Sequence, residues 1–111
     1  MATERRRRGS RGRVDALSFV EGLIDGRISL GALVEAIRLG EGETQAAFAA
    51  RLGVTRSHLC DVEKGRKVVS PERAARFARL LGYSAEQFVR LALQDAIDRA
   101  GLRYTVQVTA A

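Results

Sequence analysis

Two short helical patterns separated by a single glycine constrain the fold of this chain more than any other feature. In residues 45–64, QAAFAARLGVTRSHLCDVEK, apolar positions of the first pattern recur at helical spacing up to Leu52. Gly53 follows, and glycine adopts a left-handed backbone conformation without a steric penalty, which permits a tight turn. In the second pattern, Leu59 and Val62 share one side and hydrogen-bonding residues occupy the other. Because so short a helix is not stable on its own, we expect the rest of the chain to hold it in place.

These residues resemble the Cro and lambda-repressor-like helix-turn-helix family, also called the XRE class. The resemblance covers about residues 30–88, and seven positions carry it in type and spacing: Phe48, Ala49, Leu52, Gly53, Val54, Leu59 and Val62. It implies an all-α, five-helix DNA-binding domain. The helix from Thr55 to Lys64 would be the recognition helix, lying in the major groove of DNA. The alternative is a helical pair that only builds a core, but such a pair does not require an outward row of hydrogen-bonding side chains.

The resemblance also places the DNA contacts on and around the recognition helix. The predicted DNA-binding residues are Gln45, Thr55, Arg56, Ser57, His58, Cys60, Asp61, Lys64, Arg66 and Lys67. Arg56 is expected to bind guanine through O6 and N7, and Asp61 either accepts from cytosine or holds Arg56 in place. The basic residues at 64, 66 and 67 are expected to contact phosphates, which position a protein without reading sequence.

Two further roles follow from the same resemblance. Gln45, at the start of its helix, is expected to contact a phosphate, because a helix N-terminus offers unpaired N–H groups and partial positive charge. Arg38 is expected to pair with Glu63 and so to fix the angle of the recognition helix on the scaffold.

The net charge of +6 is concentrated in two segments. Residues 1–13 contain six arginines and one glutamate, and residues 51–79 contain eight basic and three acidic residues. Positive charge around the recognition helix suits DNA phosphates, although a solvated basic surface is the other interpretation. The arginine-rich start either threads the minor groove or adds only nonspecific affinity.

Several classes of protein are disfavoured by composition. A single cysteine without paired spacing indicates a reducing cytoplasm and no disulfide or zinc framework. No apolar run is long enough to span a membrane. His58 is predicted on a different helix face from Cys60, so a nucleophile with its base is not expected. We therefore expect a cytoplasmic protein that is not an enzyme and needs no cofactor.

The chain divides into four predicted parts. They are a disordered basic tail (1–13), an accessory N-terminal helix (14–28), the helix-turn-helix domain (29–100) and a C-terminal dimerisation strand (101–111). Within the domain, helices are expected to begin after the hydroxyl residues Ser29, Thr44, Thr55, Ser70 and Ser84, which are favourable N-caps.

The C-terminal strand predicts a homodimer. Residues 102–108 alternate between apolar and polar as a strand does, and the chain offers no convincing partner of similar length. The same strand from a second copy, antiparallel across a two-fold axis, is the simplest partner, and a frayed tail is the alternative. The helix at 85–100 has apolar positions over a wider arc than one core contact needs. Both features favour two copies, and two recognition helices would read an inverted repeat.

The function expected from these features is that of a dimeric transcriptional repressor of double-stranded DNA. The alternative is an antitoxin of a toxin–antitoxin module, because the chain resembles HigA-type antitoxins in being a small XRE-class protein with extra segments. In that case residues 1–26 would fold onto a toxin protein while the dimer represses its own operon.

Overall fold

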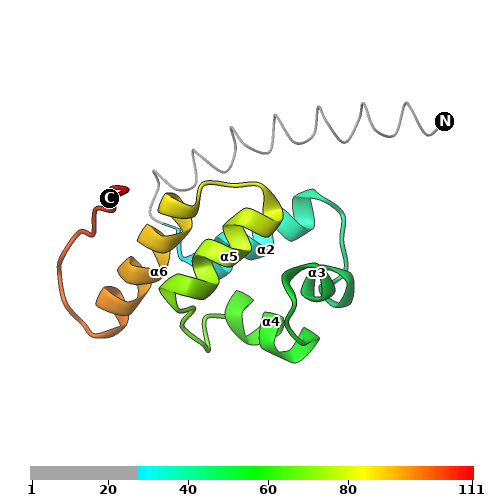
Figure 1. The fold of residues 1–111 in the computed structure, drawn as a ribbon. Helices are drawn as coiled ribbons and strands as arrows, with labels where there is room; N and C mark the ends of the chain where they lie inside the picture. The colour runs from blue at the N-terminus through cyan, green and yellow to red at the C-terminus, as the bar shows by residue number, and fades with distance from the viewer. Residues whose placement is uncertain (1–27) are drawn as a thin grey trace.

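The computed structural model of the chain describes residues 28–111. Within this range it contains five α-helices and no β-strand. They are α2 (Leu30–Gly40), α3 (Gln45–Leu52), α4 (Arg56–Glu63), α5 (Pro71–Leu81) and α6 (Ala85–Arg99), arranged as in Figure 1. The all-α, five-helix domain expected from the sequence is confirmed. The predicted basic tail and nearly all of the predicted accessory helix lie outside the described residues.

Each helix begins where the sequence placed an N-cap. The side-chain oxygens of Ser29, Thr44, Thr55, Ser70 and Ser84 each accept a hydrogen bond from the backbone N–H three residues later, at 3.0–3.3 Å. Such a bond satisfies one of the N–H groups that a helix leaves unpaired at its first turn. The five hydroxyl residues therefore determine where the helices start.

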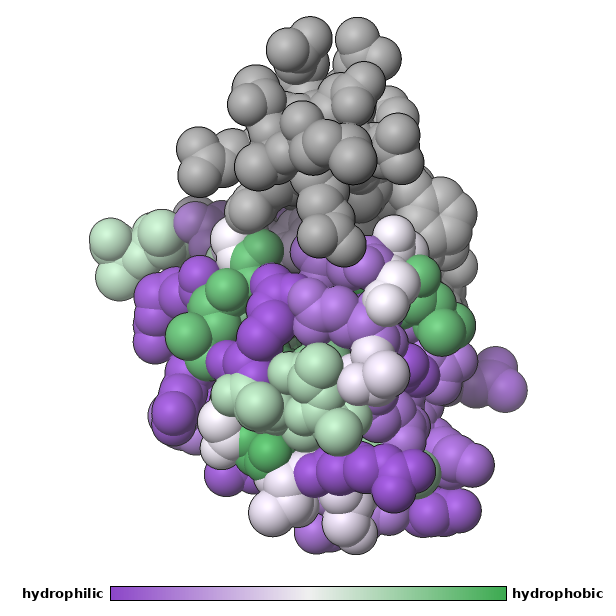
Figure 2. Space-filling model, turned by 90° about the vertical axis from the view of Figure 1, so that its right-hand side faces the viewer, coloured by the Kyte–Doolittle hydropathy of each residue, from purple (hydrophilic) through white to green (hydrophobic). Residues whose placement is uncertain are grey.

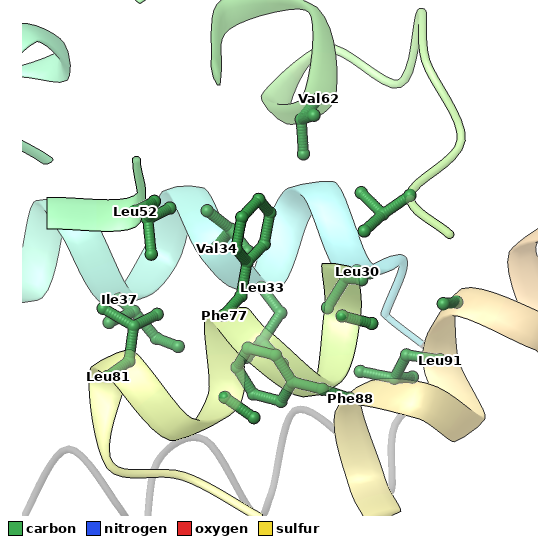
Figure 3. Packing of buried hydrophobic residues seen from close by; sticks show 14 of the residues in the cluster. Leu30, Leu33, Val34, Ile37, Leu52, Val62, Phe77, Leu81, Phe88 and Leu91 are labelled. Atoms are coloured by element: carbon green, nitrogen blue, oxygen red, sulfur yellow. The ribbon is translucent and has the colours of Figure 1, made fainter. Parts of the chain in front are cut away.

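One hydrophobic core joins all five helices. α5 packs extensively against α6, and α4 packs against both α3 and α2. Three phenylalanines, Phe48, Phe77 and Phe88, are fully buried. Figure 3 shows side chains from different helices converging, with Phe77 near Val34 of α2 and Phe88 near Leu91 of α6. Apolar burial of this kind is the main stabilising contribution to a small domain.

α2 and α4 approach each other closely at Gly31. A Cβ atom added there would lie 2.0 Å from the backbone oxygen of Val62 in α4, so only glycine fits. α6 also contacts this end of α2, because Asp95 Oδ2 accepts a hydrogen bond from the backbone N–H of Leu30 at 2.9 Å. Burial raises the pKa of Asp95, and the hydrogen bond from Leu30 opposes that shift. The start of α2 is thus held by two other helices.

The predicted C-terminal strand is not formed in the single chain. Residues 102–111 have no regular secondary structure. After Gly101, whose φ is 75°, the chain leaves α6 and runs back beside it, shown in orange to red in Figure 1. A strand requires a hydrogen-bonded neighbour, and the described part of the chain supplies no other strand. The alternation of residues 102–108 is therefore insufficient to form a strand in one copy.

None of the helices in residues 28–111 combines the length and the apolar character needed to cross a membrane.

Candidate nucleic-acid interface

The turn between α3 and α4 has the geometry that the glycine predicted. Gly53 lies in the left-handed region with φ 70° and ψ 30°. The next residue, Val54, donates its N–H to the carbonyl of Ala49 at 3.0 Å and packs against the core. Ala49 is buried, and its small side chain lets the two helices cross closely. Only three residues consequently separate the end of α3 from the start of α4, which lies at a sharp angle to α3 (Figure 1).

α4 is divided into a buried side and an exposed side. Leu59 and Val62 are buried in the core, as predicted. At the N-terminal end of the helix, Arg56 and Ser57 are exposed, and the capping residue Thr55 is exposed as well. The N-terminal end of α4 is therefore accessible to a large ligand.

The C-terminal end of α4 is fixed by a buried ion pair. Arg38 of α2 donates from Nε to Glu63 Oε2 at 2.8 Å and from Nη2 to Oε1 at 3.0 Å, which confirms the predicted pair. The side chain of Glu63 is fully buried, and that of Arg38 is 12% exposed. Hydrogen bonding to Glu63 raises the pKa of Arg38, although burial opposes the shift. Arg38 also donates from Nη1 to the carbonyl of Glu43 at 3.0 Å, so the same guanidinium holds the loop before α3.

Gln45 takes part in this network through its side chain. Its Nε2 donates to Glu63 Oε1 at 3.1 Å and so links the first residue of α3 to the last residue of α4. The sequence predicted a phosphate contact for Gln45 and did not predict this bond. The phosphate contact stays a prediction.

Asp61 does not have one of its two predicted contacts. It does not hold Arg56 but pairs with Arg66 Nη1 at 3.3 Å and with Lys67 Nζ at 3.8 Å. The reason is helical geometry: residues five apart lie about 140° apart around a helix, whereas neighbours on one face are three or four apart. Gly65, with φ 73°, turns the chain after α4 so that the two basic residues return towards Asp61.

His58 has a partner that the sequence did not reveal. Its Nε2 lies 2.9 Å from Nη1 of Arg73 in the first turn of α5. A guanidinium only donates, so Nε2 accepts and the ring is neutral with its proton on Nδ1. Burial lowers the pKa of His58, the charges of Arg73 and Lys67 lower it further, and Asp61 opposes them. The position of Arg73 just after the basic loop was the available signal, but its contact depends on how α5 crosses α4.

The basic side chains around α4 form an accessible positive surface. Arg56, Lys64, Arg66, Lys67 and Arg73 are exposed, and Cys60 is half-buried among the residues of α4. On the α3 side of the molecule, Figure 2 shows a mostly hydrophilic face with small separate hydrophobic patches. The exposed basic residues around α4 suit a polyanion.

Comparison with known proteins agrees with this geometry. A family model described as a helix-turn-helix domain matches residues 29–91, more than half of the chain. The matched range includes α2 to α5 and the first part of α6, so it contains the two helices, α2 and α3, that pack most closely against α4. No curated protein and no solved structure gives a significant match.

Proposed function

Because the chain belongs to the helix-turn-helix domain family, we propose that it is a sequence-specific transcriptional repressor that binds double-stranded DNA as a homodimer. The geometry of α4 carries the proposal. Its last residue is fixed by Arg38, whereas Arg56 and Ser57 at its start are exposed. In helix-turn-helix proteins, the N-terminal residues of the second helix contact base edges in the major groove. Domains of this family typically act by binding and not by catalysis.

The contacts divide into those that read bases and those that bind phosphates. Arg56 is proposed to bind guanine, Ser57 a base edge or a phosphate, and Cys60 a thymine methyl group. Asp61, which pairs with two basic residues in the free protein, would have to exchange those partners to accept from cytosine. The phosphate contacts are assigned to Gln45, Lys64, Arg66 and Lys67, and the remaining proposed contacts are Thr55 and His58.

A homodimer determines the form of the operator. Two copies of α4 related by a two-fold axis reach successive major grooves on one side of the duplex, about 34 Å apart. The proposed operator is therefore an inverted repeat. Occupying such a site within a promoter excludes other proteins from it, and this is the proposed mechanism of repression.

Selection of bound DNA from a random pool tests the proposal directly. The expected result is enrichment of one inverted repeat, with half-sites about one helical turn apart. The Arg56→Ala variant serves as the matched control, and it should retain the symmetry of the selected sites but lose preference at one base position in each half. DNA that is bound but not enriched in any sequence would show a nonspecific basic protein and would contradict the proposal.

An antitoxin function is the second candidate. It is supported by the residues before position 29, which the matched domain does not include, together with the resemblance to HigA-type antitoxins. Co-purification of the full chain with the product of the neighbouring gene tests it. A complex that is lost when residues 1–26 are deleted supports this function, and the absence of any complex contradicts it.

A further inference from the structure

One side chain of α6 binds two backbone groups of the C-terminal segment. Gln94 donates from Nε2 to the carbonyl of Tyr104 at 2.8 Å, and its Oε1 accepts from the N–H of Val106 at 2.9 Å. The same Nε2 also donates to Asp98 Oδ1 at 2.9 Å, which orients the amide. Gln94 therefore occupies the position that a neighbouring strand would take along one edge of residues 104–106.

The opposite edge of this segment is left available. In an extended chain, successive residues direct their N–H and C=O groups to opposite sides. Because the C=O of Tyr104 and the N–H of Val106 bind Gln94, an extended conformation of this segment would direct the groups of Thr105 to the opposite edge. Within the described residues, positions 103–111 make no backbone–backbone hydrogen bond. An edge of this kind is a template for pairing with another strand.

The apolar side chains of the segment are only partly covered. Leu102 and Tyr104 are 47% and 67% exposed, and Val106 and Val108 are half-buried. In an extended chain these four even-numbered residues share one face, and the odd-numbered polar residues share the other. The segment therefore has a free backbone edge and an incompletely covered apolar face.

We propose that a second copy of the same segment pairs with this free edge, antiparallel, with the two-fold axis at Thr105. The inference rests on the homodimer of the proposed function and specifies its interface and register. Pairing about Thr105 places Leu102 opposite the partner's Val108, and Tyr104 opposite the partner's Val106. Each exposed apolar residue thus faces a valine, and cross-strand pairs of this type stabilise a sheet.

Neighbouring registers complete fewer of these pairs. With the axis at Tyr104, Val108 has no apolar strand residue opposite it. With the axis at Val106, Leu102 faces only Ala110 of the other copy. With the axis at Arg103, two arginines lie directly opposite each other, which is unfavourable. The register at Thr105 pairs all four apolar residues among themselves, so the segment is complementary to itself.

Disulfide trapping of the full-length protein tests the register. In a Cys60→Ser background, Thr105→Cys places two thiols on a hydrogen-bonded antiparallel pair, whose Cα atoms are about 5.5 Å apart. This separation lies within the range for disulfides. Mild oxidation is expected to convert most of the Thr105→Cys protein to a covalent dimer.

Two single-cysteine variants serve as matched controls. Arg103→Cys should cross-link at least tenfold less than Thr105→Cys. In the proposed register the two copies of residue 103 lie four positions apart along the strand, roughly 13 Å from each other. Mixing Arg103→Cys chains with Gln107→Cys chains should restore cross-linking, because these residues face each other in the proposed register. Equal trapping of Thr105→Cys and Arg103→Cys, or no trapping of Thr105→Cys, would overturn the proposal.

Gln94→Glu tests the role of α6 in presenting the strand. Glutamate keeps an acceptor for Val106 but loses the donor to Tyr104, so we expect the dimer dissociation constant to rise about tenfold in sedimentation experiments. Gln87→Glu, an exposed position on the same helix, should leave it unchanged. Equal dissociation constants for both variants would contradict the role of Gln94.

The outcomes separate this inference from the proposed function. Trapping at Thr105 without enrichment of any DNA sequence would support the dimer and contradict the repressor. A monomer that still selects a half-site would overturn the dimer and leave sequence-specific binding in place.

Discussion

Glu63 is the residue whose removal should change the orientation of α4 most. Its carboxylate accepts hydrogen bonds from Nε and Nη2 of Arg38 and from Nε2 of Gln45, with no exposure to solvent. Glu63→Ala would leave the nearly buried guanidinium without its hydrogen-bonded counter-charge. We expect a loss of about 3–5 kcal/mol in the free energy of unfolding, measured by urea denaturation.

Two comparisons distinguish this mechanism from a general effect of losing a carboxylate. Replacing both partners, as in Arg38→Met with Glu63→Leu, should recover most of the loss, because no unpaired charge then remains. Glu72→Gln, at an exposed position in the first turn of α5, should cost less than about 1 kcal/mol. A double variant as unstable as Glu63→Ala would contradict the expectation.

His58 should make stability depend on pH. Burial and the charges of Arg73 and Lys67 place its folded-state pKa below the ordinary value of 6.5. As the pH falls, the unfolded chain therefore binds a proton at His58 before the folded chain does. The contribution of His58 to the free energy of unfolding is thus complete above pH 6.5 and is lost as the pH falls below that value. His58→Gln should remove this component from the urea midpoints measured between pH 8 and pH 5.

The same residue offers a spectroscopic test of the DNA interface. His58 is the only histidine in the chain, so an NMR titration follows a single imidazole. The midpoint should lie below 6.5 in the free protein, move up in Arg73→Gln, and move up on adding DNA if phosphates lie near the ring. A midpoint unchanged by bound DNA would exclude His58 from the interface.

At the scale of elements, the contact between α2 and α4 depends on Gly31. Gly31→Ala would force its Cβ against the backbone oxygen of Val62, 2.0 Å away, and backbone cannot rotate aside as a side chain can. We expect destabilisation by about 1–3 kcal/mol or more. Gly40→Ala, at the end of the same helix and with open space around its Cβ, should be neutral or stabilising by up to about 1 kcal/mol. Thermal unfolding of both variants would show the contrast, and equal effects would contradict it.

The helices were predictable because their signals are local. Five N-cap residues marked their starts, and Gly53 marked the sharp end of α3 with a positive φ. The Arg38–Glu63 pair was implied by family resemblance and is confirmed. Contacts that depend on how helices cross were missed, such as Gln45 with Glu63 and Arg73 with His58.

The C-terminal segment shows what the sequence alone could not predict. Its alternation predicted a strand, but pairing is a property of two segments and is not encoded in one. Nor did the pattern reveal the role of Gln94, because a polar helix residue gives no sign in the sequence of the backbone groups that it binds.

For the whole molecule, the distribution of charge predicts how binding responds to salt. The logarithm of the association constant should fall linearly with the logarithm of the salt concentration, by about 0.9 per neutralised phosphate. Lys67→Ala should weaken binding to all sequences alike and reduce the slope by about 0.9 per protomer. Arg56→Ala should instead lower discrimination at one base position by about 1–3 kcal/mol. Titrations with the selected operator and with random DNA would show the difference, and identical behaviour of the two variants would contradict the assignment of roles.

The anchor of α4 at Glu63 lies at the opposite end of the helix from its exposed first residues. The groups that fix the orientation of this helix lie at its last residue and on its inner side, whereas Arg56 and Ser57, two of the side chains proposed to read bases, are its first two residues and are exposed. Substitutions at Arg56 and Ser57 therefore alter no buried contact. In the proposed mode of binding, substitutions at these two positions would change base preference without first damaging the fold.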